Sequence, residues 1–179
     1  IAVAANQPNY KWEFNLVEDN QANAFCLPGG KVVVYTGILK YAKNDDQLAT
    51  VISHEVAHAL ARHGAERVTQ GMIQQGVGLI GSVAVAATAP QYQNAFNQAY
   101  GLGSNLGVML PYGRMQETEA DEIGIYLMHK AGYNVNEATK FWENMSEGKS
   151  GGNDFFSTHP SSQNRTKDIQ TVINKIGNE

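Results

Sequence analysis

The stretch Asp45–His63, which reads DDQLATVISHEVAHALARH, decides the fold of this chain. It contains no Gly or Pro, Asn44 or Asp45 can cap its start, and Gly64 follows its end. These features predict one continuous helix over 45–63. At about 100° per residue, its larger apolar side chains share one stripe. The stripe consists of Leu48, Ile52, Val56, Ala59 and Leu60.

Two histidines of this helix, His54 and His58, lie on one side of it, away from the apolar stripe. Because they are four residues apart, both imidazoles can reach a single Zn²⁺. Glu55 follows His54 directly, so its carboxylate can take a proton from a water that the metal activates. The pattern therefore predicts a catalytic site with one Zn²⁺ per chain, and the alternative is a solvated helix face.

The third protein ligand distinguishes the classes of zinc peptidase. In the metzincin pattern a third histidine stands six residues after the second, with a glycine midway. Here those places hold Gly64 and Ala61, and His63 comes one position too early. The sequence therefore excludes a metzincin and predicts that His63 is a surface or cap residue.

A candidate third ligand lies downstream, in Glu117-Thr118-Glu119-Ala120-Asp121. Glu117 and Asp121 are four residues apart and share a face of the helix expected over 116–131. Glu117 can ligate zinc while Asp121 accepts the second N–H of a ligating histidine and fixes its tautomer. The alternative is a pair of acidic residues favoured by the dipole at the start of a helix.

The remaining patterns predict an α+β domain that is mainly helical and has a small antiparallel sheet near its N-terminus. Strands are expected over 10–18, 23–27 and 31–36, with a turn at Pro28-Gly29-Gly30 between the last two. Further helices are expected over 116–131, 136–147 and 161–176. Their expected core residues are Ala120, Ile123, Leu127, Met128, Phe141, Trp142, Met145, Ile169, Val172, Ile173 and Ile176.

Composition narrows the function classes. The 179 residues carry a formal net charge of -4, and no run of Lys or Arg exceeds a pair, so nucleic acid is not an expected partner. The length fits one domain, 1–179, and a single cysteine, Cys26, excludes an internal disulfide. No signal peptide is visible, and we expect a soluble chain.

Residues 68–113 contain no Asp, Glu, Lys or Arg. One interpretation is a pair of buried helices with a loop near Pro90, and the other is a helical flap or plug that contacts a membrane or an envelope protein. The most apolar part, 77–89, is too short to span a bilayer as a helix, which takes about 20 residues.

Four groups of residues, taken in order, resemble one known family. They are Asn23–Gly30 (NAFCLPGG), His54–His58, Glu117–Asp121, and His159-Pro160-Ser161 followed by Arg165. Together they resemble the HtpX-like gluzincin metallopeptidases, which include type I CAAX prenyl proteases, Oma-like proteases and soluble bacterial envelope proteases of the BepA and LoiP type. The likeness runs from about residue 23 to about residue 165.

The resemblance implies a gluzincin zinc site. It assigns His54, His58 and Glu117 as ligands and Glu55 as the base, in agreement with the spacing. It implies that His159 stabilises the oxyanion of the tetrahedral intermediate. Arg165 is implied either to orient the wall of the site or the His159 loop, or to make a structural salt bridge.

The resemblance also implies where a substrate binds. A polypeptide substrate would add as an extended strand beside 23–27, which makes Asn23 and Ala24 candidate substrate-binding residues. Cys26 departs from the small or apolar residue usual in the family. It is expected to be a small buried hydrophobe, and the alternative is an inhibitory thiolate on the metal.

The function expected from these residues and from the resemblance is hydrolysis of unfolded or misfolded proteins by a zinc endopeptidase. Its expected setting is protein quality control in the bacterial cell envelope, in the periplasm or at a membrane. Two alternatives stay open: a catalytically latent zinc protein that acts as a chaperone or adaptor, and a membrane-docking module that uses residues 68–113. The sequence leaves the oligomeric state undecided.

Overall fold

The computed structural model describes residues 1–27, 29–66, 112–148 and 155–177. The chain divides into two compact units, Ile1–Gly64 with Pro111–Glu179, and Ala65–Leu110. All but the last two residues of the uncharged segment 68–113 fall outside the described residues, and so do the predictions of paired helices or a flap there. That one domain spans 1–179 stays a prediction. The labelled strands and helices all belong to the first unit.

A three-stranded mixed sheet opens this unit, in the order β1-β3-β2. β1 is Glu13–Val17, β2 is Ala24–Leu27 and β3 is Lys31–Tyr35. β2 and β3 form the expected antiparallel hairpin, and positive φ angles at Gly29 and Gly30 make its turn. β1 instead pairs with β3 in parallel, so the prediction of an antiparallel sheet is wrong for this pair.

The connection from β1 to β2 explains the parallel pair, because it crosses the end of β3 to reach the opposite edge of the sheet. The amide of Gly37 donates to the carbonyl of Asp19 over 2.8 Å, and the Asp19 amide donates to Thr36 Oγ1 over 3.1 Å. A Cβ at Gly37 would lie 2.2 Å from the carbonyl oxygen of Gln21, so only glycine fits under this crossing.

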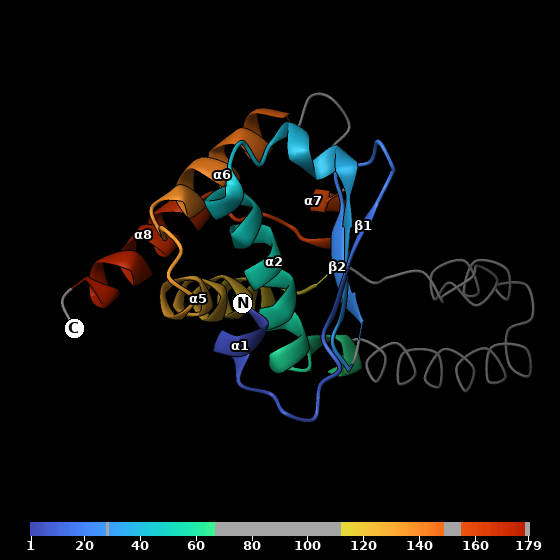
Figure 1. The fold of residues 1–179 in the computed structure, drawn as a ribbon. Coiled ribbons are helices and arrows are strands. Elements are labelled where there is room, and N and C mark those ends of the chain that lie inside the picture. The colour runs from blue at the N-terminus through green and yellow to red at the C-terminus, as the bar shows by residue number, and fades with distance from the viewer. Residues whose placement is uncertain (28, 67–111, 149–154, 178–179) are drawn as a thin grey trace, which may run out of the picture. The chain divides into compact units, whose positions relative to one another are not determined.

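The other labelled elements of the unit are helices, which confirms the α+β class (Figure 1). The long helices are α2 (Asp45–Leu60), α5 (Arg114–Lys130), α6 (Glu137–Glu147) and α8 (Arg165–Ile176). The short ones are α1 (Ala2–Ala5), the 3-10 helix η1 (Thr36–Lys40) and α7 (Phe155–Thr158). Asn44 is the N-cap of α2, since its side chain accepts from the Gln47 amide over 2.8 Å. Gly132, with φ of 82°, follows the end of α5 as predicted.

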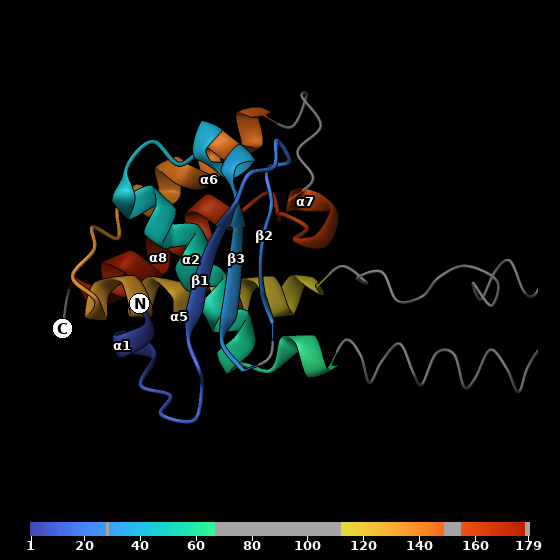
Figure 2. The same ribbon diagram turned by 45° about the vertical axis from the view of Figure 1, so that its right-hand side comes forward.

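α2 is the central element of the unit. It packs against α5 and α6 on one side and against β2 and β3 on the other, and α8 packs on α5 and α6. Figure 2 shows α2 between the sheet and these helices. The core lies around α6 and α8, where Phe141, Trp142, Met145, Ile169, Val172, Ile173 and Ile176 are buried as predicted. On α5, Ala120, Leu127 and Met128 are buried and Ile123 is partly buried.

α5 crosses α2 closely at Gly124. A Cβ at this position would lie 3.3 Å from the backbone nitrogen of His54 and 3.4 Å from its Cα. Real Cβ contacts are rarely so short, so a larger residue would push the two helices apart. The crossing therefore sets how near the side chains of α5 come to His54.

The end of α2 differs from the prediction. The helix ends at Leu60, Ala61 is its C-cap, and Arg62 has φ of 60° in the left-handed region. A new helical stretch then begins at His63. The prediction of one continuous helix to His63 is wrong, and the left-handed residue redirects the side chain that follows it.

Within the described ranges, no helix combines the length and the apolar character needed to cross a membrane.

Candidate metal centre

α2 brings the two predicted histidines and Glu55 into the interior. The residues His54, Glu55 and His58 are at most 1% exposed. The Nε2 atoms of His54 and His58 lie 3.1 Å apart. Both nitrogens therefore face one point, as the spacing predicts.

Glu117, on α5, joins the two histidines from the neighbouring helix. Its Oε1 lies 3.1 Å from His58 Nε2, and its Oε2 lies 3.3 Å from His54 Nε2. The side chain is buried. The structure thus brings together the three residues predicted to be zinc ligands, although they come from two helices far apart in the sequence.

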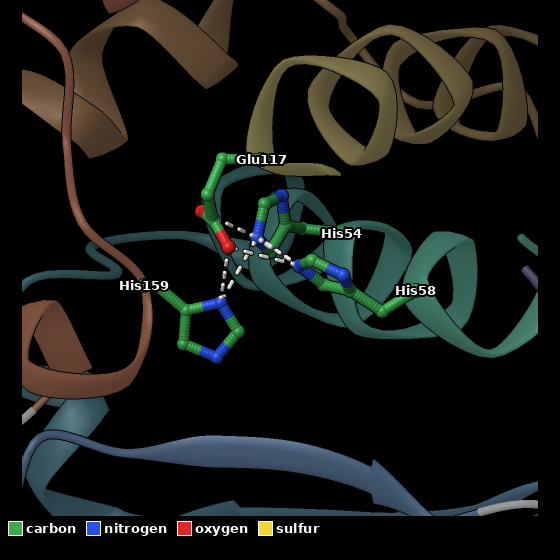
Figure 3. A group of neighbouring side chains, drawn as sticks. All are labelled: His54, His58, Glu117 and His159. Carbon is green, nitrogen blue, oxygen red and sulfur yellow. Dashed lines mark hydrogen bonds and ion pairs between the residues drawn. The ribbon is translucent and has the colours of Figure 1, made fainter. Parts of the chain in front are cut away.

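His159, which follows α7, adds a fourth donor to the group (Figure 3). Its Nδ1 lies 3.0 Å from Glu117 Oε1 and 3.4 Å from His54 Nε2. Its ring stacks on Phe155 at a centroid distance of 4.2 Å, and its amide donates to the Phe155 carbonyl over 2.9 Å. The Nδ1 atom of His159 thus lies among the candidate ligand atoms.

These four side chains fit a zinc ion. Each offers one ligand atom, and these atoms all lie within 4.8 Å of one another. Imidazole nitrogens with one carboxylate oxygen are ligands that zinc takes in proteins. The buried carboxylate of Glu117 already has one cationic neighbour, Arg165, whose Nη2 lies 3.4 Å from Glu117 Oε2, and a divalent cation would add to this compensation of its charge.

Asp121 and Arg165 surround the first histidine. Asp121 Oδ1 lies 2.9 Å from His54 Nδ1, which is the contact expected of a carboxylate that fixes the tautomer of a ligand. Arg165 Nη2 donates to the same Asp121 oxygen over 2.7 Å. The guanidinium lies 3.4 Å from the ring centre of Trp142. Arg165 thus forms a salt bridge with Asp121, and its Nη2 also lies 3.4 Å from His54 Nδ1, so both predicted roles of Arg165 stay predictions.

The second histidine has a neighbour that the sequence did not reveal. His63 is buried, so its assignment as a surface residue is wrong. Its Nδ1 lies 3.0 Å from His58 Nδ1, and its Nε2 lies 3.2 Å from Glu119 Oε2. In a continuous helix His63 would point about 140° away from His58, and the left-handed Arg62 removes that separation.

Tyr112 is a second residue that the sequence did not indicate. It stacks on the face of His58, with ring centroids 3.8 Å apart and planes 17° apart. Its amide donates to the Thr158 carbonyl over 2.9 Å, one residue before His159. Tyr112 stands near the end of the uncharged segment, where no periodicity marks it.

Burial and the two nearby carboxylates have opposite effects on the histidine pKa values. Burial disfavours the charged form of His54, but Glu117 and Asp121 outweigh it and raise its pKa to about 9. Burial lowers the pKa of His58 to about 2 and that of His159 to about 4. Burial opposes the ionised form of Glu117, yet His54 and the hydrogen bonds of the other histidines lower its pKa. In the metal-free protein, these pKa values favour the imidazolium form of His54 and the neutral rings of His58 and His159 at neutral pH.

The predicted substrate residues lie at an edge of the sheet. Among the described residues, β2 pairs with β3 alone, and Ala24 is its first residue. Asn23 Oδ1 accepts from the Ala24 amide over 2.9 Å. A role of Asn23 and Ala24 in substrate binding stays a prediction.

Cys26 is partly buried and is not part of the metal-binding group. Burial, followed by the charge of Glu55, raises the pKa of its thiol to about 12. The thiol is therefore protonated at neutral pH, which favours the buried hydrophobe over the inhibitory thiolate.

Known proteins are similar in sequence to this chain over nearly its whole length. The model of peptidase family M48 matches residues 1–173. The chain is 40% identical over 173 residues to the mitochondrial metalloendopeptidase OMA1 of Schizosaccharomyces pombe, covering 95% of this chain and 49% of that protein. It is 31% identical over 170 residues to human OMA1, covering 90% and 32%. It is 29% identical over 178 residues to the beta-barrel assembly-enhancing protease of Escherichia coli K12, covering 96% and 36%.

The chain thus spans about a third to about half the length of these curated relatives. The matches confirm the resemblance to Oma-like gluzincin metallopeptidases. On the extent of the family match, the chain belongs to peptidase family M48.

Proposed function

We propose that this chain is a zinc-dependent endopeptidase domain that hydrolyses peptide bonds in unfolded or misfolded proteins. The observation that carries the proposal is the buried group of His54, His58, Glu117 and His159, with Glu55 on the same helix as the first two. The names of the relatives support it, because the OMA1 proteins are called metalloendopeptidases.

His54, His58 and Glu117 would hold the zinc ion. When bound, the ion acts as a Lewis acid and supplies an activated water at neutral pH. Asp121 holds the N–H of His54 Nδ1, so that His54 Nε2 keeps its lone pair for the metal.

Glu55 is the general base in this proposal. Its carboxylate is buried beside the metal-binding group, and its Oε1 lies 3.4 Å from His159 Nε2. It takes the proton of the attacking water and passes it to the leaving amine. His159 is near enough to Glu55 and to the ligands to donate a hydrogen bond to the developing oxyanion when its ring turns outward.

A polypeptide would bind in extended form along β2. In the described part of the chain that strand is at the edge of the sheet, and it packs against α2, which carries Glu55. Backbone hydrogen bonds to Asn23 and Ala24 would then give affinity without strict sequence preference, as an unfolded substrate requires.

A catalytically latent zinc protein is the second candidate, and His159 favours it. A zinc site closed by four protein ligands is structural, whereas a catalytic one keeps a position open. With His159 Nδ1 directed at Glu117 and His54, four donors converge and the site is closed. In this candidate the chain acts as a chaperone or adaptor until His159 moves away.

For the setting of this activity we propose protein quality control in a cell envelope or at a membrane. The named relatives include mitochondrial proteins and a bacterial protease called beta-barrel assembly-enhancing. The bacterial periplasm, and contact of residues 68–113 with a membrane or an envelope protein, stay predictions.

Cleavage of casein by wild-type chain and Glu55→Gln tests the proposal. We expect the variant to retain zinc and to lose about 10²- to 10⁴-fold of the cleavage rate, because the base is absent. Glu122→Gln is the matched control, since it makes the same change at an exposed position of α5. Equal cleavage by wild type and Glu55→Gln would refute the assignment of the base.

A further inference from the structure

We propose that His63 and Glu119 are positioning residues that hold His58 in the tautomer needed for metal binding. The inference rests on the proposed function, because it concerns the same metal. Three side chains form a chain of two hydrogen bonds: Glu119 Oε2 lies 3.2 Å from His63 Nε2, and His63 Nδ1 lies 3.0 Å from His58 Nδ1.

The chemistry of these groups decides which atom donates in each of the two hydrogen bonds. A carboxylate oxygen accepts hydrogen bonds, so in the proposed tautomer the ring hydrogen of His63 is on Nε2, facing Glu119. His63 Nδ1 then has a lone pair and accepts the N–H of His58 Nδ1. This leaves the lone pair of His58 on Nε2, which faces His54 Nε2 at 3.1 Å and Glu117 Oε1 at 3.1 Å.

The backbone around His63 holds this arrangement in place. Arg62, in the left-handed conformation, turns the chain so that His63 lies beside His58 instead of on the far side of a longer helix. His63 is 2% exposed, and Tyr112 covers the face of the His58 ring. His58 is thus held at both nitrogens and on one face.

One stretch of α5 supplies three of the carboxylates of the site, in addition to Glu55 on α2. Glu117 faces the Nε2 atoms of the two histidines, and Asp121 contacts His54 Nδ1 directly. Glu119, between them in sequence, reaches His58 Nδ1 through His63. Glu119 itself is exposed, with 58% of its side chain accessible, so it has no role in the core that would explain the contact.

Zinc affinity of His63 variants, measured by competition with a chromophoric chelator, tests the proposal. Partners that orient a metal ligand are worth about 10- to 100-fold in affinity, so we expect His63→Leu to bind zinc weaker by that factor. His63→Asn places an amide oxygen near the position of Nδ1 and can still accept from His58. We expect this variant to recover most of the affinity, which a loss of packing alone would not allow.

Variants of Glu119 keep the test decisive even if His63→Leu does not fold. Glu119→Lys replaces the acceptor of the His63 Nε2 hydrogen with a donor. This opposes the proposed donor and acceptor order of the two hydrogen bonds, so zinc affinity should fall. Glu122→Lys makes the same charge change at another exposed position of α5 and should have a smaller effect. In the His63→Asn background, Glu119→Lys and Glu122→Lys should have equal zinc affinities, since the imidazole ring that connects Glu119 to His58 is gone.

Nitrogen NMR of the histidine rings in zinc-loaded Glu55→Gln gives a readout independent of activity. We expect His63 to be protonated at Nε2 and unprotonated at Nδ1. A His63 protonated at Nδ1, or equal zinc affinity of wild type, His63→Leu and Glu119→Lys, would overturn the inference alone. A wild-type chain that binds no zinc would overturn the proposed function together with it.

Discussion

His159 is the residue on which the state of the site depends. Its Nδ1 is 3.0 Å from Glu117 Oε1, and its Nε2 is 3.4 Å from Glu55 Oε1, so one ring contacts both a candidate ligand and the candidate base. Stacking on Phe155 and the backbone bond to it hold the ring there. Burial lowers the pKa of His159 to about 4, which keeps it neutral and able to ligate at pH 7.

His159→Ala separates the two roles of this residue. If His159 is chiefly a donor to the oxyanion, casein cleavage should fall by about 10²- to 10³-fold with zinc retained. If it closes the site as a fourth ligand, cleavage should rise while zinc binds more weakly. We expect the fall, because the proposed peptidase keeps a position open for water and His159 Nε2 lies 3.4 Å from the candidate base Glu55. The assay is the cleavage rate per bound zinc, and a rise with weaker zinc binding would contradict the open site.

The sequence predicted correctly those contacts between single residues that depend only on their spacing along a helix. His54 and His58 face one point as predicted, because i, i+4 pairs share a helix face, and Glu117 joins them from α5. His63 was missed because a single left-handed residue, Arg62, ends the helix early. Non-glycine residues seldom adopt this conformation, which costs roughly 1–2 kcal/mol, so no pattern in the sequence indicated it.

At the scale of helices and strands, the crossing of α2 and α5 brings the residues of the site together. α2 carries the histidines and Glu55, and α5 carries Glu117, Glu119 and Asp121. The two helices approach closely at Gly124, against the backbone of His54. Distances within the metal-binding group therefore depend on a glycine that takes no part in the chemistry.

Gly124→Val should weaken zinc binding without touching a ligand side chain. The added side chain meets backbone atoms of His54 that cannot move freely, so the helices separate and the free energy of unfolding falls by about 1–3 kcal/mol. Urea denaturation and chelator competition measure the two effects. Gly64→Ala is the control, since a Cβ there meets no atom within 4 Å and stability should hold or rise. Wild-type zinc affinity in Gly124→Val would show that the crossing does not set the site.

The helices were predictable because each has a clear apolar stripe or a terminal signal. Gly132 ends α5 as expected, and the apolar side chains predicted to be core on α6 and α8 are buried. The order of the strands was not predictable in the same way. Alternation and the turn at 28–30 indicate strands and a hairpin, but the crossing over β3 depends on close contacts at Gly37 that no local pattern encodes.

At the scale of the whole molecule, family membership and the metal site support each other. The family match extends over residues 1–173, and the group of four donors joins residues from α2, α5 and the segment after α7. The relatives are about two to three times as long as this chain, so the substrates and partners of the whole protein remain proposals. The uncharged segment 68–113 is the largest part of the sequence whose role depends on experiment.

The most direct measurement is calorimetric titration of zinc into chelator-stripped chain at about pH 7.5, repeated in buffers of different ionisation enthalpy. With the pKa of His54 raised to about 9 and those of His58 and His159 lowered to about 2 and about 4, only His54 carries a proton that zinc must displace.

We predict one zinc per chain and release of about one proton, with the release disappearing as the pH rises above about 9. Glu117→Ala should bind far more weakly, whereas the exposed Glu122→Ala should match wild type. Failure of the wild-type chain to bind zinc, or unchanged binding by Glu117→Ala, would contradict the central claim that this buried group is the metal centre.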